Sequence, residues 1–130
     1  MRYVKLSEEE VLGIGKTYES ILSTAAYGLL SKKGETIGKI IAESLKSDDY
    51  FDEAAEEIKN RGWVEDIEID DNTIRVKGSI EANNENSEPS CHILKGILKN
   101  IYSQKYHFVK IDEVECVSEG KEMCVFKVTR

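Results

Sequence analysis

The sequence predicts an α+β domain in which about four helices cover one face of an antiparallel sheet built from two hairpins. Apolar residues recur at helical spacing up to residue 62 and again after residue 90. They alternate with polar residues in 63–82 and 108–128, and each alternating stretch has turn-forming residues in its middle. The predicted order is therefore three helices, a hairpin, a helix and a second hairpin.

The first helix begins with a capping signature, because Ser7 is followed three residues later by Glu10. Glycines within residues 13–15 predict a break in this helix, and the Lys-Lys-Gly sequence at 32–34 predicts its end. Between the start at Ser7 and the end at Gly34, the apolar residues of the predicted helix share one face: Val11, Ile14, Tyr18, Ile21, Ala25 and Leu29.

Two more helices are predicted before the first hairpin. One covers residues 35–46, and the next follows Ser47 as its N-cap and ends at Gly62. The hairpin then pairs residues 63–70 with 73–82, where Ile74, Val76 and Ile80 point inward. Residues 83–88 contain no apolar side chain and are predicted to be a loop.

Pro89 and Ser90 are predicted to open the fourth helix, and the last hairpin pairs residues 108–117 with 123–128. If this hairpin turns about Gly120, the numbers of opposed residues sum to 240. Two opposed pairs follow from that sum: Cys116 with Cys124, and Val114 with Phe126.

Composition limits the possible functions. The 130 residues fit a single domain, 1–130, and 25 acidic against 18 basic residues give a net charge of −7, which disfavours nucleic-acid binding. The sequence has neither an apolar run long enough to span a membrane nor a signal-peptide pattern, so we expect a cytoplasmic protein that does not bind membranes. Gly15-Lys16-Thr17 resembles the end of a phosphate-binding loop, but Glu10 occupies the position of that motif's first glycine.

The three cysteines are the most informative residues. Cys116 and Cys124 are close enough in the predicted pairing to share a metal ion, and Cys91 lies at a helix N-terminus, where the dipole is expected to lower its pKa. Three thiolates suit zinc. Three separate buried thiols remain the alternative on these grounds alone.

The spacing of Cys91, Glu113, Cys116 and Cys124, together with Gly96 and Gly120, resembles the 4-vinyl reductase type of small-molecule-binding domain. The resemblance is strong from Ser90 onward and looser before residue 85, where residues 21–45 look like the earlier half of that domain. It implies a fold related to heme nitric-oxide-binding domains and to subunits of the transport-particle tethering complex.

The resemblance implies a structural zinc held by Cys91, Glu113, Cys116 and Cys124. In a regular strand Glu113 would face away from Cys116, so a β-bulge is needed between them. Without a bulge, His92 is the alternative fourth ligand. The polar residues that hold phenols in related sensors have no matched positions here, so phenol sensing does not carry over.

The sequence shows no convincing nucleophile or acid–base pair, so we expect a non-enzymatic protein. The resemblance implies that it binds a small hydrophobic ligand. The long apolar face of the first helix and the dimeric habit of similar domains lead us to expect a homodimer. Two alternatives are a dimeric interaction scaffold without a ligand and an accessory protein in tetrapyrrole metabolism. Residues predicted to line the ligand pocket are Ile37, Ile41, Phe51, Trp63, Ile97, Ile101 and Tyr102.

Overall fold

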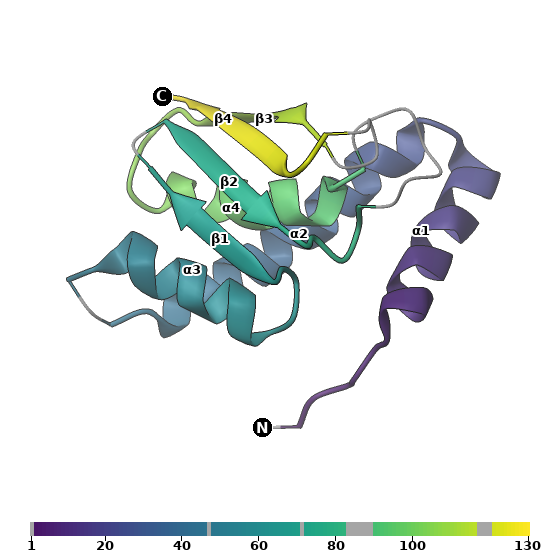
Figure 1. Ribbon diagram of the computed structural model, residues 1–130, viewed down its shortest axis with the longest axis horizontal. Coiled ribbons are helices and arrows are strands. Elements are labelled where there is room, and N and C mark those ends of the chain that lie inside the picture. The colour runs from purple at the N-terminus through teal and green to yellow at the C-terminus, as the bar shows by residue number, and fades with distance from the viewer. Residues whose placement is uncertain (1, 47, 71, 83–89, 117–120) are drawn as a thin grey trace.

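The computed structural model describes residues 2–46, 48–70, 72–82, 90–116 and 121–130. Helices lie on one face of a four-stranded antiparallel sheet, as predicted (Figure 1). The elements in chain order are α1 (Glu8–Leu22), α2 (Ala25–Ser44), α3 (Tyr50–Asn60), β1 (Asp66–Ile69), β2 (Thr73–Lys77), α4 (His92–Ser103), β3 (Lys110–Glu115) and β4 (Cys124–Thr129). None of the described helices has the length and apolarity that crossing a membrane requires.

The first helix begins as predicted but ends elsewhere. Ser7 and Glu10 form the capping box. The predicted break at residues 13–15 is wrong, because α1 runs through both glycines and ends at Leu22. The chain instead turns at Ser23, whose φ of 52° lies in a region that L residues seldom adopt. The predicted apolar face is therefore divided between two helices, and none of the residues of α1 is buried.

Gly34 was predicted to end a helix and instead lies in the middle of α2, so that prediction is wrong. Gly34 and Gly38 allow α2 to approach the backbone of α4, and Gly96 on α4 faces Ser31 in the same way. A Cβ atom on Gly34 would lie 1.9 Å from the carbonyl oxygen of Ile93, which no real contact permits. These glycines are retained for close packing, which outweighs their low helix propensity.

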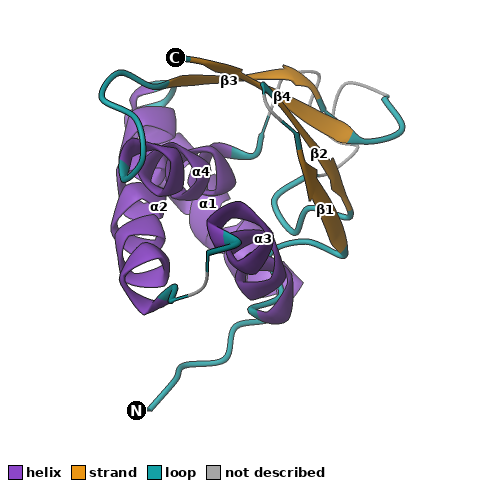
Figure 2. Cartoon of the chain, turned by 90° about the vertical axis from the view of Figure 1, so that its left-hand side faces the viewer, coloured by secondary structure: helices purple, strands orange, loops and turns teal. Residues whose placement is uncertain are grey.

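The close approach of α2 to α4 holds α4 between α2 and the sheet (Figure 2). The buried residues of α4 are Leu94, Gly96, Ile97, Leu98, Ile101 and Tyr102. They meet the inward side chains of β2 and β4, including Ile74, Val76, Phe126 and Val128. Helix α3 adds Ala54 and Ile58 to this core. Its N-cap is Asp49, and the predicted N-cap Ser47 lies outside the described residues.

The strands pair in the order β1-β2-β4-β3, and all three pairings are antiparallel. Both predicted hairpins are present, although their strands are shorter than predicted. The predicted loop at 83–88 and the turn at Gly120 lie outside the described residues. Helix α4 begins at His92 with Cys91 as its N-cap, and not at Pro89, which is also outside the described residues.

The alternation predicted for residues 73–82 does not extend to Ile80. Strand β2 ends at Lys77, and Gly78 has a φ of 66°, a conformation that glycine adopts without strain. The chain therefore changes direction after β2. Ser79 and Glu81 become buried, whereas Ile80 stays partly exposed.

Two glycines of α2 provide a test of the α2–α4 contact. We expect Gly34→Ala to lower the free energy of unfolding by about 1–3 kcal/mol or more, since its Cβ would overlap the α4 backbone. Gly28→Ala is the matched control, because no atom lies within 4 Å of its added Cβ. It should raise stability by up to about 1 kcal/mol. Urea unfolding measures both, and equal effects would contradict the close helix contact.

Candidate functional site

Four potential metal ligands meet where the N-terminus of α4 reaches the end of the β3–β4 pair. Cys91 is the N-cap of α4, Glu113 lies on β3, Cys116 follows β3 directly, and Cys124 begins β4. Their ligand atoms all lie within 4.8 Å of one another. The structure thus brings together the four residues that the sequence analysis selected.

The spacing of the three sulfur atoms suits one tetrahedral ion. The Cys91 and Cys124 sulfurs are 3.6 Å apart, and the Cys124 and Cys116 sulfurs are 3.7 Å apart. A zinc ion with sulfur ligands at about 2.3 Å has sulfur–sulfur edges of about 3.8 Å in a tetrahedron. All three cysteines are fully buried and none forms a disulfide.

A β-bulge directs Glu113 toward the cysteines. The pairing of β3 with β4 shifts between Glu113 and Glu115, so Glu113 is opposite Phe126. The predicted pairing of Val114 with Phe126 is therefore wrong, and Val114 is half exposed. Beyond the bulge, Glu115 pairs with Val125 and follows the predicted sum of 240.

One oxygen of the Glu113 carboxylate accepts a hydrogen bond, and the other is available to bind a cation. Its Oε1 accepts a hydrogen bond of 3.1 Å from the backbone N–H of Cys91. Its Oε2 is buried and has no hydrogen-bond partner among the described residues. An unpaired buried oxygen is costly unless another group, such as a cation, binds it.

The site strongly disfavours negative charge in the absence of a cation. Contacts with Cys116 and Cys124, followed by burial, raise the pKa of the Cys91 thiol, and burial raises the pKa of Glu113. The expectation that the helix dipole lowers the pKa of Cys91 is therefore wrong, because these effects outweigh it. A divalent ion would lower these pKa values, because it attracts the deprotonated thiolates and the carboxylate.

His92, the alternative fourth ligand, is not part of this cluster. Its ring stacks on Tyr27 of α2, with ring centroids 4.2 Å apart. The stack is a contact between the start of α4 and the start of α2. Glu113 is therefore the fourth potential ligand that the geometry favours.

Two polar residues next to the cluster were missed by the sequence analysis. The Ser79 hydroxyl lies 3.2 Å from the Cys91 sulfur. The Glu81 carboxylate accepts hydrogen bonds from the backbone N–H groups of Ile93 and Leu94, at 2.9 and 2.8 Å. Glu81 therefore accepts from the amides of the first turn of α4 that have no partner within the helix. Gly78 was the available signal, because a glycine at the end of a strand often marks a change of face.

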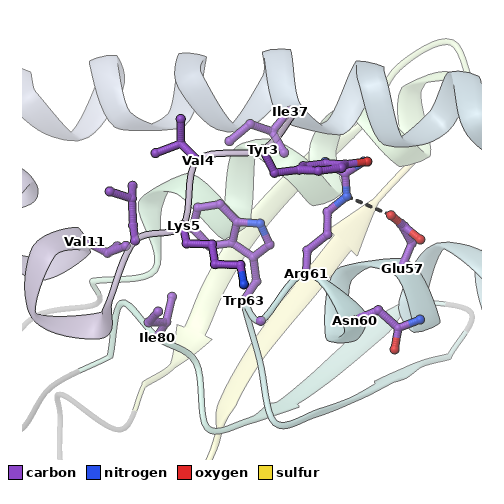
Figure 3. A pocket seen from close by; sticks show the side chains of 12 residues that line it. Tyr3, Val4, Lys5, Val11, Ile37, Glu57, Asn60, Arg61, Trp63 and Ile80 are labelled. Carbon is purple, nitrogen blue, oxygen red and sulfur yellow. Dashed lines mark hydrogen bonds and ion pairs between the residues drawn. The ribbon is translucent and has the colours of Figure 1, made fainter. Parts of the chain in front are cut away.

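A pocket of about 690 Å³ lies between the N-terminal segment, α2 and the loop that follows α3 (Figure 3). Its volume is in the range of small-molecule sites. Residues 3–6 form one wall, and Arg61 and Glu57 form an ion pair of 2.8 Å at its edge. The apolar lining includes Val4, Val11, Ile37, Trp63 and Ile80.

The predicted pocket residues are divided among three places. Ile37 and Trp63 line the large pocket. Phe51 and Tyr102 line a smaller one of about 140 Å³, next to Arg130. Ile41, Ile97 and Ile101 are fully buried core residues. Their assignment to a ligand site remains a prediction.

The fold and site together define an α+β domain with a buried cluster of three cysteines and a glutamate. The V4R domain family matches residues 72–130, which include all four clustered residues. This match confirms the resemblance to 4-vinyl reductase domains found in the sequence. Among curated proteins, no match to the chain was found.

Two solved structures share the fold. The phenol-responsive sensory domain of the transcription activator PoxR, solved with phenol, superposes with a TM-score of 0.78 at 17% identity, covering 98% of this chain and 76% of that chain. A vinyl-4-reductase family protein from Methanocaldococcus jannaschii superposes with a TM-score of 0.58 at 21% identity, covering 99% of this chain and 98% of that one. At these identities the likeness establishes the fold.

Glu81 makes stability depend on pH. Burial raises its pKa to about 8 from an ordinary 4.5, against the opposing effect of the two α4 amides. The folded chain then retains a proton that the unfolded chain has lost. The contribution of protonated Glu81 to the free energy of unfolding is therefore complete below about pH 4.5. It is lost as pH rises toward 8, at about 1.4 kcal/mol per pH unit.

We expect Glu81→Gln to make the fall of stability with pH less steep, because the amide keeps an acceptor oxygen but does not titrate, and to leave the part that the raised pKa of Glu113 contributes. Urea unfolding of both proteins between about pH 5 and pH 8 measures the difference. Glu68→Gln, an exposed change on β1, should keep the wild-type slope. Parallel pH profiles for wild type and Glu81→Gln would contradict the assignment.

Proposed function

We propose that this chain binds a small hydrophobic molecule without transforming it, in a fold stabilised by a structural zinc ion. The observation that carries the proposal is the pocket of about 690 Å³, whose apolar wall includes Ile37 and Trp63. A related fold that binds phenol supports it, since PoxR was solved with that molecule. The ligand of this chain is expected to be largely apolar.

The cysteine cluster supports the zinc part of the proposal. Its sulfur spacing fits Zn²⁺, and the unpaired Glu113 oxygen supplies a fourth ligand. Zinc bound to four protein ligands has no open position for a substrate, so its role here would be structural. It would join α4 to the β3–β4 pair, which are distant along the chain.

Zinc content and thermal stability test this role. We expect about one zinc per chain in protein purified without chelator, and a marked fall in melting temperature for Cys124→Ser or after chelation. Glu113→Gln should weaken zinc retention less than a cysteine change, because water can replace one oxygen ligand. Glu115→Gln, exposed on the same strand, is the control.

Two results together would contradict the zinc proposal: elemental analysis that finds less than about 0.1 zinc per chain, and three cysteine thiols that react freely in the folded protein.

The pocket is tested by the fluorescence of Trp63, the single tryptophan of the chain. Phenol, naphthalene and 1-octanol are the probes. We expect at least one of them to change the emission saturably, and Ile37→Asn to weaken that response about tenfold or more by placing an amide in the apolar wall.

Ile40→Asn is the matched control, because Ile40 lies on the same helix but is half exposed and outside the pocket lining. Equal weakening by both variants, or no saturable response to any probe, would contradict a ligand site here.

A second candidate function, a dimeric interaction scaffold, is favoured by the exposed apolar side chains of α1. Ile14 and Ile21 are 40% and 73% exposed although α1 is a regular helix. We propose that a second copy of the chain covers this face. Sedimentation should then give a mass of twice 14.7 kDa, whether or not the pocket binds a ligand.

A further inference from the structure

Among the described residues outside the cluster, Ser79 makes the shortest hydrogen-bond contact with a cysteine sulfur. Its hydroxyl oxygen lies 3.2 Å from the Cys91 sulfur, and the residue is 6% exposed. The left-handed conformation of Gly78 places it there, because the chain leaves β2 and turns toward the N-terminus of α4. The contact therefore results from the backbone and not from a flexible surface side chain.

In the metal-free cluster the Cys91 thiol donates to the Ser79 hydroxyl oxygen, so the proton of this hydroxyl becomes available to the sulfur once Cys91 is a thiolate. Within the part of the chain that the structure describes, Cys91 is the hydrogen-bond partner of the Ser79 side chain. Ser90, the other serine near the cluster, donates to the carbonyl oxygen of Glu81 at 3.1 Å and lies 3.7 Å from the Cys116 sulfur. Ser79 is thus better placed than Ser90 to donate to a thiolate.

Charge explains why such a donor is needed. Three thiolates and one carboxylate around a divalent cation leave a net charge of −2 in a buried site. The backbone N–H of Cys91 donates to Glu113 and not to sulfur. A buried negative charge is stable only when hydrogen bonds or nearby cations offset it.

We propose that Ser79 is a positioning residue of the metal site, which donates its O–H to the metal-bound sulfur of Cys91 while Glu81 holds the first turn of α4 in place. This inference rests on the proposed zinc site. Residues 79–81 then support the cysteine from two directions, through its sulfur and through the helix that it caps. Such outer contacts typically change metal affinity 10- to 100-fold.

Cobalt(II), which reports sulfur ligation by its absorption, tests the proposal in the full-length chain. A hydrogen bond to a thiolate lowers the energy of the sulfur electrons, so its loss moves the sulfur-to-cobalt charge-transfer band to longer wavelength. We expect this shift in Ser79→Ala, and about tenfold faster transfer of bound zinc to a competing chelator.

Ser103→Ala is the matched control, because its hydroxyl is on α4 and bonds to the carbonyl oxygen of Lys99. It should leave both the band and the transfer rate unchanged, and Ser90→Ala should shift them less than Ser79→Ala. A Ser79→Ala protein with the wild-type band would overturn the proposal, even if its melting temperature fell. Wild-type protein that binds neither cobalt nor zinc would instead overturn the metal site itself.

Discussion

The contact between the backbones of α2 and α4 is the constraint on which the rest of the structure depends. Glycines on both helices remove the side chains that would keep them apart, so α4 lies deep between α2 and the sheet. The first turn of α4 is then partly buried, and the backbone N–H groups that have no partner within the helix need partners elsewhere in the protein. Glu81 and Glu113 provide them from two separate segments of the chain.

This arrangement also determines the chemistry at the start of α4. The pKa values of Cys91 and Glu113 in the cluster, and of Glu81 next to it, are all raised, so this region disfavours negative charge. Such a cluster is stable either fully protonated or bound to a cation. The match of the sulfur spacing to a tetrahedral ion favours the second state. The bulge in β3 contributes to this site, because it turns Glu113, the fourth potential ligand, toward the cysteines.

The sequence predicted the fold class, the capping box and the four clustered residues, because periodicity, capping and spacing are local or family-wide signals. It failed where a distant contact decides the local structure. From the sequence alone Gly34 has the pattern of a helix end, and only its contact with the backbone of α4 explains why a glycine lies within α2. The burial of Ser79 likewise depends on the positive φ of Gly78. The turn at Ser23 had no signal at all, because serine does not favour positive φ.

The wall that residues 3–6 form beside the large pocket has a kinetic consequence. Tyr3 and Val4 are 72% and 86% exposed, so this segment has few contacts that hold it in place. Local opening of such a segment needs far less free energy than unfolding of the core. A molecule in the pocket would therefore leave past residues 3–6, and its residence time would depend on how often these four residues detach rather than on the stability of the domain.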